Sequence, residues 1–183
     1  MRNSHILSSS FCFVLALATV SAGSNCPDGW KFFQRPSRGV CLKLFTGGGN
    51  CLGVCTNANV ESKCRDMGGA LAGYQNQDEI NWFTREYNLL SMVGRRTDQE
   101  LPRLKGIESY IWVGAKRIPN TDEFRWTDPY IDGKGFFNFY LINGKPKWGP
   151  ETGRDCAYHR NGQTLPIDCN RTTSTYVCVK PAN

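Results

Sequence analysis

Nine cysteines in a chain of 183 residues constrain the possible folds more than any other feature of this sequence. So many thiols in so short a chain are typical of proteins that fold in an oxidising compartment and are cross-linked by disulfides. The length suits one domain rather than two. With 40% apolar and 21% charged residues, the composition is that of a folded globular chain, not of a disordered or membrane-embedded one.

The first 22 residues have the pattern of a secretory signal peptide. An early positive charge on Arg2 is followed by an apolar run at residues 11–20, which ends in the small residues of Val20-Ser21-Ala22. A membrane anchor is the alternative, but a span needs about 20 apolar residues and this run is roughly half as long. No later apolar run is long enough to span a bilayer. We therefore expect cleavage after Ala22 and secretion of a single domain of residues 23–183.

Cleavage leaves eight cysteines, since Cys12 belongs to the signal peptide. An even number of cysteines in a secreted chain indicates a disulfide framework. Zinc is the competing interpretation, because Cys51 and Cys55 have a spacing that zinc sites tolerate, but the other cysteines lack matching pairs. Eight cysteines allow 105 pairings, so spacing alone does not choose among them.

An N-terminal hairpin and a first helix are predicted by the local patterns. In residues 26–46, two short strands rich in aromatic and apolar residues flank an Arg-Pro-Ser-Arg-Gly turn. A helical pattern begins at Asn59, with apolar residues on one face. The pair Gly68-Gly69 is typical of a helix C-terminus and ends this pattern.

A second helix, a long loop and several short strands follow. Asn76 and Glu79 have the spacing of a capping box at the start of the second helix. Residues 91–108 are polar and contain Gly and Pro, which predicts a long loop. Short strands are predicted at residues 110–114, 124–126, 157–158 and 176–179. Helices segregated from a largely antiparallel sheet make the predicted fold class α+β.

Five short motifs occur in a fixed order along the mature chain. They are Cys-Pro-Asp-Gly-Trp at 26–30, Gly-Gly-Ala-Leu-Ala at 68–72, Gln-Asn-Gln-Asp-Glu at 75–79, Trp-Val-Gly-Ala at 112–115 and Phe-Arg-Trp-Thr-Asp at 124–128. With the cysteines around them, they resemble the long form of the C-type lectin-like domain over nearly the whole mature chain. The resemblance implies a disulfide-stapled α+β fold with two helices, short antiparallel sheets and long loops. The N-terminal hairpin would be residues 26–46 and the core residues 58–180.

The resemblance also implies how the cysteines pair. One disulfide would tie the first helix to the last strand, a second would close the loop region, and a third would staple the N-terminal hairpin. The remaining two cysteines are left to each other. The implied pairs are Cys64–Cys178, Cys156–Cys169, Cys26–Cys41 and Cys51–Cys55.

Sugar-binding members of this family hold calcium through a Glu-Pro-Asn or Gln-Pro-Asp triplet, a further Glu and a Trp-Asn-Asp triplet. Calcium requires six to eight oxygen ligands. Here the proline that corresponds to the first triplet is Pro146, and its neighbours are Lys145 and Lys147. Counted back from Cys169, the Trp-Asn-Asp positions read Thr164-Leu165-Pro166. We therefore expect no calcium, and no other cofactor, at the usual sugar site.

Basic and aromatic residues in the second half of the chain form a candidate ligand face. Lysine and arginine can neutralise sulfate or phosphate groups, and aromatic rings pack on sugar rings. The candidate residues are Lys145, Lys147, Trp148, Arg154, Tyr158 and Arg160. A second basic group comprises Arg95, Arg96, Arg103 and Lys105. For both groups the alternative is an ordinary solvated surface, because acidic residues are interspersed among them.

These features predict a secreted recognition module that binds an extracellular carbohydrate or glycoconjugate without calcium. A protein ligand is the alternative, since the long loops at residues 91–108 and 127–155 could form a recognition surface. Nucleic acid does not suit an exported chain. Catalysis is not expected, because the mature chain has one histidine, His159, and neither an HExxH nor a GxSxG motif. We expect His159 to be exposed, or packed near the Cys156 disulfide.

The mature chain contains one Asn-x-Ser/Thr sequon, Asn170-Arg171-Thr172. Its position between two cysteines predicts a surface turn, where N-glycosylation is expected. The alternative is a sequon that is not used.

Overall fold

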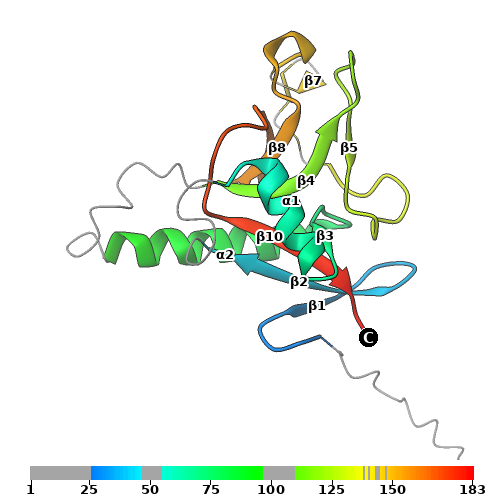
Figure 1. The fold of residues 1–183 in the computed structure, drawn as a ribbon, viewed down its shortest axis with the longest axis vertical. Coiled ribbons are helices and arrows are strands. Elements are labelled where there is room, and N and C mark those ends of the chain that lie inside the picture. Colours follow the sequence, from blue (N-terminus) through cyan, green and yellow to red (C-terminus); the bar gives the residue numbers. More distant parts are fainter. Residues whose placement is uncertain are drawn as a thin grey trace, which may run out of the picture.

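The structure is a computed structural model that describes residues 26–46, 55–96, 110–137, 139, 141–142, 145–146 and 148–183 (Figure 1). The expected signal peptide lies outside these residues. The helices are α1 (Asn57–Asp66) and α2 (Gln77–Arg96). The main sheet consists of β1 (Lys31–Gln34), β2 (Gly39–Phe45), β3 (Ala70–Leu71), β4 (Ile111–Arg117), β5 (Phe124–Trp126), β8 (Cys156–Arg160), β9 (Gln163–Ile167) and β10 (Tyr176–Pro181). A separate hairpin of β6 (Leu141–Ile142) and β7 (Lys145–Pro146) precedes the 3-10 helix η2 (Pro150–Thr152).

The main sheet is largely antiparallel, as predicted. Its strands run in the order β1-β2-β10-β4-β8-β9, with β3 paired to β10 and β5 paired to β4. Among the described strand pairs, β10 and β4 alone are parallel, and they pair at Tyr176 and Trp112. The N-terminal hairpin joins the C-terminal strand through a continuous register from Phe45 opposite Tyr176 to Val40 opposite Pro181. The two ends of the domain are therefore held together in the middle of one sheet.

The two helices pack against two separate buried clusters, one on each face of the sheet (Figure 1). Val60 of α1 packs in one cluster with Trp112. Phe83 of α2 packs in the other cluster with Val113. Successive residues of a strand point to opposite faces, so β4 supplies both clusters from neighbouring positions. The predicted α+β fold class with two helices is confirmed.

Helix α1 begins and ends at clear local signals. Thr56 is the N-cap: its hydroxyl accepts a hydrogen bond from the backbone N–H of Asn59, and the Asn59 side chain accepts one from the backbone N–H of Thr56. The helix therefore starts at Asn57, two residues earlier than the sequence predicted. It ends where predicted, because Gly68 adopts a φ of 76°, which glycine reaches without steric cost.

Helix α2 is longer than the sequence predicted. The Asn76 side chain accepts a hydrogen bond from the backbone N–H of Glu79 at 3.1 Å, as the capping-box spacing predicted. The prediction of a loop is wrong for residues 91–96, because α2 continues to Arg96. Gly94 costs this helix only about 1 kcal/mol relative to alanine. Residues 97–108 of the predicted loop lie outside the described residues. In the described part of the chain, neither helix has the length and apolarity needed to cross a membrane.

The three disulfides that join described cysteines are the pairs that the resemblance implies. Cys64–Cys178 ties α1 to β10 across 114 residues of sequence. The other two are Cys26–Cys41 at the N-terminal hairpin and Cys156–Cys169 beside β8 and β9. Cys55 is also disulfide-bonded. Its expected partner, Cys51, lies outside the described residues.

The hairpin of β8 and β9 was predicted only in part. The sequence predicted a strand at residues 157–158, whereas β8 is longer and β9 was missed. Asn161 and Gly162 connect the two strands with φ values of 50° and 77°. Asn-Gly is the dipeptide preferred in a two-residue hairpin turn, so a signal was present in the sequence. Pro166 obscures the strand pattern but is tolerated because β9 is at the edge of the sheet.

Candidate functional site

Trp148 and Arg154 are the two residues of the predicted ligand face that the structure brings together. They lie before and after η2, at the two ends of one short loop. The guanidinium carbon of Arg154 is 4.1 Å from the centroid of the Trp148 ring, a cation–π contact. Both side chains are half-buried. The loop therefore presents an indole ring and a positive charge side by side at the surface.

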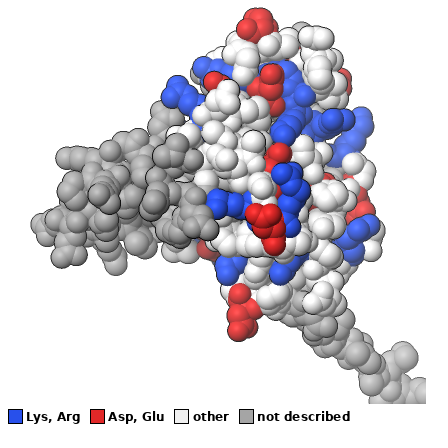
Figure 2. All heavy atoms as spheres, viewed as in Figure 1, with Lys and Arg blue, Asp and Glu red and all other residues white. Residues whose placement is uncertain are grey.

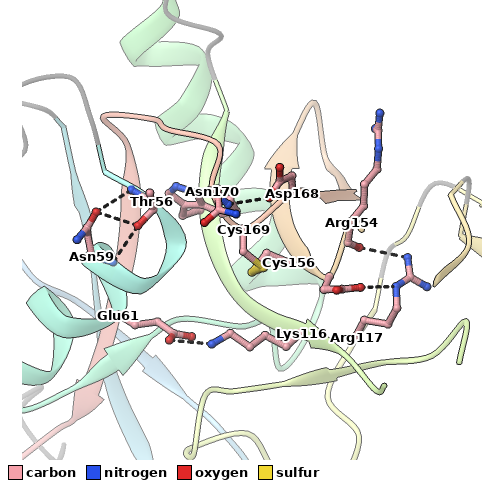
Figure 3. Close-up of a disulfide and its surroundings, with 12 residues drawn as sticks. Thr56, Asn59, Glu61, Lys116, Arg117, Arg154, Cys156, Asp168, Cys169 and Asn170 are labelled. Atoms are coloured by element: carbon pink, nitrogen blue, oxygen red, sulfur yellow. Dashed lines mark hydrogen bonds and ion pairs between the residues drawn. A yellow bond between two sulfur atoms is a disulfide. The ribbon is translucent and has the colours of Figure 1, made fainter. Parts of the chain in front are cut away.

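Arg117, the last residue of β4, binds both ends of this loop. Its contact with the carbonyl oxygen of Arg154 is drawn in Figure 3. One guanidinium nitrogen, Nη2, donates to the carbonyl oxygens of Trp148 at 2.7 Å and Arg154 at 3.2 Å. The other, Nη1, donates to the carbonyl oxygen of Thr121 at 3.2 Å. The Nε atom forms an ion pair with Asp155 at 3.3 Å, and the Arg117 side chain is 1% exposed. A guanidinium has five N–H donors in a fixed plane, so one side chain sets the separation of Trp148 and Arg154.

A series of aromatic contacts connects this loop to the core. The guanidinium carbon of Arg117 is 4.5 Å from the ring centroid of Phe124. From Phe124 the ring contacts continue through Phe139 at 4.7 Å and Phe137 at 5.3 Å to Trp126 at 4.3 Å. These four rings pack on the buried cluster beneath α2. The position of Arg117 is therefore fixed from the apolar side as well as by its polar contacts.

A buried group of charged residues fixes the segment after β5, at a place where the sequence suggested no site. Arg35, in the turn between β1 and β2, forms ion pairs with Glu79 at 2.8 Å and Asp128 at 3.0 Å, and all three side chains are 0% exposed. Asp128 also accepts a hydrogen bond from the backbone N–H of Gly73 at 3.0 Å. These contacts join the N-terminal hairpin, the start of α2 and the segment after β5.

The environment of this group shifts the pKa of two of its members. Burial raises the pKa of Asp128 above its ordinary value, although Arg35 and two backbone N–H groups favour the charged form. Burial opposes the charge on Arg35, but hydrogen bonds and Coulomb attraction from Glu79 and Asp128 hold the pKa of its guanidinium above the ordinary value. With two carboxylates around one guanidinium, the group depends on Arg35 for its charge balance.

Two other residues of the predicted face lie apart from Trp148 and Arg154. Tyr158 is on β8 and contacts Tyr110 with 4.9 Å between ring centroids, in the cluster on the α1 side. Arg160 is exposed at the far end of β8, beside the turn into β9. Arg154 precedes the other end of this strand, and five residues of β strand span about 16 Å. The structure therefore does not bring Tyr158 and Arg160 together with the Trp148–Arg154 pair.

The remaining basic residues add little to the described site. Lys145 is in β7 and is described by its backbone alone, as are Arg95 and Arg96 in α2, whereas Lys147, Arg103 and Lys105 lie outside the described residues. On the face seen in Figure 2, lysine and arginine side chains are interspersed with acidic ones and form no uniform basic patch. The described candidate site is therefore centred on Trp148, Arg154 and Arg117.

The side chains at the three expected calcium positions in β9 do not fit calcium. Thr164, Leu165 and Pro166 lie in β9, where Thr164 is fully buried and the other two have no side-chain oxygen. Across the described part of the chain, no three histidine, cysteine or carboxylate side chains form a group that could hold a metal ion. Calcium needs six to eight oxygen ligands, which this triplet does not supply.

His159 is packed, but on the face of the sheet opposite to the Cys156 disulfide. Its Nδ1 is 2.6 Å from the Tyr74 hydroxyl and its Nε2 is 3.2 Å from the Thr84 hydroxyl. The Thr84 hydroxyl already donates to the Ile80 carbonyl at 2.8 Å, so Nε2 carries the ring proton and Nδ1 accepts from Tyr74. Burial lowers the pKa of His159 from 6.5 to about 4. A histidine in a catalytic triad bonds to a carboxylate and to a nucleophile such as serine. Among the described residues, the ring of His159 bonds to neither.

The family model of the lectin C-type domain matches residues 55–180, which is more than half of the chain. The chain belongs to the C-type lectin domain family. Domains of this family are recognition modules and not enzymes, in agreement with the buried, neutral His159. No curated protein matches this C-type lectin domain.

Solved structures share its fold. The cow C-type carbohydrate-recognition domain of CD23, crystallised in the presence of a GlcNAc2Man3 oligosaccharide, has 16% sequence identity and a TM-score of 0.60, over 87% of this chain and 98% of that one. A calcium-independent type II antifreeze protein has 15% identity and a TM-score of 0.59, over 89% and 99%. The mouse scavenger receptor C-type lectin carbohydrate-recognition domain has 20% identity and a TM-score of 0.53, over 86% and 99%. At these identities the similarity shows the fold alone.

Proposed function

We propose that this C-type lectin domain recognises an acidic carbohydrate outside the cell, such as a sulfated glycan, without calcium at the usual sugar site. The Trp148–Arg154 pair carries the proposal, because it combines an indole ring and a guanidinium 4.1 Å apart in one half-buried loop. The disulfide framework supports the extracellular location, since such bonds persist in oxidising compartments.

The chemistry of the two side chains suits an anionic sugar. A guanidinium binds sulfate or carboxylate oxygens through two parallel N–H donors, and such charge-assisted hydrogen bonds are the strong ones. The guanidinium carbon of Arg154 lies 4.1 Å from the centroid of the indole ring. A guanidinium carries five N–H donors around the edge of its plane, and a cation–π contact with the indole leaves these donors able to bind an anionic group. The indole surface beyond the guanidinium would contact the apolar side of the sugar ring.

The contacts of Arg117 support this proposal, because they prepare the loop before a ligand binds. One buried guanidinium binds two carbonyl oxygens of this loop, those of Trp148 and Arg154, together with Asp155 and the Thr121 carbonyl between β4 and β5. A binding site that is already ordered loses less conformational entropy when the ligand binds. The pair at the surface would thus bind more tightly than the same two side chains on an unrestrained loop.

Calcium independence is proposed from the chemistry of the triplet in β9. Thr164 is buried there, and Leu165 and Pro166 offer no side-chain oxygen. One solved protein of the same fold is described as calcium-independent, which supports the view that this fold does not require the ion.

A protein ligand is the second candidate. It is favoured by two exposed apolar side chains in the segment after β5, Phe136 at 40% and Leu141 at 51%. Exposed apolar residues are a feature of protein-binding surfaces. Binding to such a surface would depend weakly on salt, whereas binding of a sulfated glycan weakens as salt screens the charges.

The test measures the affinity of the purified domain for heparin-derived oligosaccharides and for their desulfated counterparts. We expect Arg154→Gln to weaken binding about tenfold, as the loss of one charge-assisted contact implies. Arg160→Gln is the matched control: it removes the same charge at the other end of β8 and is expected to change the affinity by less than about twofold. Equal losses in the two variants, or equal binding of the desulfated oligosaccharide, would contradict the proposal.

A further inference from the structure

We propose that Asn170 carries an N-linked glycan. Asn170-Arg171-Thr172 has the acceptor pattern for N-glycosylation. The pattern is an asparagine, then any residue except proline, then serine or threonine. Asn170, Arg171 and Thr172 are all exposed, in the segment that connects β9 to β10. The inference is independent of the ligand proposed above.

The structure gives this segment the form of a surface turn on a rigid base. The Asp168 side chain accepts a hydrogen bond from the backbone N–H of Asn170 at 2.9 Å, and its carbonyl accepts one from the backbone N–H of Arg171 at 3.0 Å. Thr173, the next residue after the sequon, is buried. Figure 3 shows Asn170 beside Asp168 on this turn, one residue after the Cys156–Cys169 disulfide. Asp168 and Thr173 therefore hold the ends of a turn whose tip is in solvent.

The Asn170 amide is available for modification. The described residues include no hydrogen-bond partner for its side chain, because the contact with Asp168 is made by the backbone N–H. A glycan attached to an exposed turn stays in solvent and displaces no packed side chain. Other exposed asparagines, such as Asn81 on α2, lack the hydroxyl residue two positions later. Asn170 thus combines the acceptor pattern with an exposed position, where an attached glycan is compatible with the folded domain.

The modification transfers an oligosaccharide from a lipid-linked diphosphate donor. The amide nitrogen of Asn170 forms a bond to the first carbon of the reducing-end sugar while the bond from that carbon to the phosphate oxygen breaks. One amide proton is released and the lipid diphosphate leaves. No electron is gained or lost by the protein.

Two hydrogen bonds that form when the domain folds favour transfer of the glycan before folding is complete. The carbonyl oxygen of Cys169 accepts a hydrogen bond from the backbone N–H of Asn57 at 3.1 Å. The carbonyl oxygen of Thr172 accepts one from the Tyr110 hydroxyl at 2.9 Å. Both contacts hold the backbone on either side of the acceptor in its folded conformation, so transfer is expected to be more efficient before they form. Mild reductant during synthesis is therefore expected to raise the fraction of chains that carry the glycan.

The experiment expresses the full chain with its own first 22 residues in a eukaryotic secretory host. We expect a secreted protein whose mass falls after treatment with a peptide N-glycosidase, with Asn170 converted to aspartate in the corresponding peptide. Asn170→Gln and Thr172→Ala are expected to abolish the mass shift. Thr172→Ser keeps the acceptor pattern and is expected to retain it, and the control Asn81→Gln leaves it unchanged.

Peptide mapping of the unsubstituted chain keeps the test valid if a variant fails to fold. A secreted chain with unmodified Asn170 would overturn the proposal, as would a chain that is not exported. A mass shift that persists in Asn170→Gln would do the same, because it would place the glycan elsewhere. Loss of glycan binding in Arg154→Gln bears on the proposed ligand alone and leaves this inference intact.

Discussion

Two buried arginines, Arg35 and Arg117, organise two regions of this C-type lectin domain in different ways. Arg35 lies in the turn of the N-terminal hairpin and binds two carboxylates that are as buried as itself. Arg117 lies at the end of β4 and binds three backbone carbonyls and one carboxylate, Asp155, whose side chain is 58% exposed. Both guanidiniums bind oxygen atoms of segments that are distant in sequence. Their partners differ in charge and in exposure to water.

Because the partners differ, we expect the loss of Arg35 to lower the stability of the core and the loss of Arg117 to lower the order of the loop. Removing Arg35 leaves charged carboxylates in a dry interior, where an unpaired charge is very unfavourable. Removing Arg117 leaves carbonyl oxygens close to the surface, which water can satisfy. The core region is therefore intolerant of change, whereas the loop that carries Trp148 and Arg154 could vary without loss of the fold.

The largest effect is expected for Arg35→Met. Glu79 and Asp128 would remain buried without their cation, so the free energy of unfolding should fall by about 3–5 kcal/mol. Denaturant unfolding with the disulfides intact measures it. Arg38→Met, an exposed change three residues away in the same turn, is the control and should cost less than about 0.5 kcal/mol.

The triple variant Arg35→Met, Glu79→Gln and Asp128→Asn sharpens this prediction. It removes the unpaired charges and should recover much of the lost stability. If Arg35→Met costs no more than Arg117→Met, the contrast between the two arginines is wrong.

The next largest effect is expected in the pH dependence of the free energy of unfolding, which arises from the buried His159 of the core. The unfolded chain binds a proton on His159 with the ordinary pKa of 6.5, whereas burial lowers the pKa in the fold to about 4. Above pH 6.5 the histidine is neutral in both states. As the pH falls from 6.5 to 4, the unfolded chain takes up a proton that the folded chain does not, and the free energy of unfolding falls by about 3 kcal/mol.

Comparison of the wild-type domain with His159→Gln isolates this contribution. Tyr74, which faces the ring, is neutral throughout this pH range, and burial raises its pKa further above the ordinary value. Asp128 titrates in both proteins, so its effect cancels in the difference. Between about pH 7 and about pH 4, the free energy of unfolding should therefore fall more in the wild-type domain than in His159→Gln. An equal fall in the two proteins would mean that His159 is not neutral in the fold.

A smaller loss of stability, but a larger change in the loop, is expected for Arg117→Met. The carbonyls of Trp148 and Arg154 would exchange the guanidinium for water, at a cost of about 1–2 kcal/mol. Hydrogen exchange of residues 148–155 should become faster, and affinity for a sulfated glycan should fall. Lys116→Met is the control, because its ion pair with Glu61 is partly exposed and contributes less than about 1 kcal/mol. Unchanged exchange in Arg117→Met would show that the aromatic contacts alone hold the loop.

The sequence predicted those parts of the fold that depend on local patterns and on the order of the cysteines. The N-terminal hairpin and the starts of both helices to within two residues follow from local signals. The three described disulfides follow from the resemblance to the C-type lectin-like domain, because cysteine spacing alone did not choose among the pairings. The extent of α2 was misjudged, because Gly94 is a weak helix breaker in a favourable context. The partners of Arg35 were not predictable, since Glu79 and Asp128 are 44 and 93 residues away.

The candidate site shows the same limit. Composition predicted basic and aromatic residues near the C-terminal half, and Trp148 and Arg154 do lie together. Tyr158 and Arg160 were grouped with them because the full length of β8 was not recognised. Because β8 is five residues long, Arg160 lies at the end of this strand farthest from Arg154. Side chains alternate between the two faces of a strand, and Tyr158 therefore packs against the cluster on the α1 side. Arg117 was missed because its partners are carbonyl oxygens, which carry no sequence signal.

The smallest effect is expected from calcium itself. The carbonyls of Trp148 and Arg154, together with Asp155, are already bound by the guanidinium of Arg117. A ligand that binds the folded state raises the melting temperature, so millimolar calcium should shift it by less than about 1 °C. Magnesium is the control for a general effect of ionic strength, and a chelator should leave binding of a sulfated glycan unchanged. A specific rise with calcium that disappears in Arg117→Met would reverse the comparison, because the loop would then be organised by the ion and the arginine together.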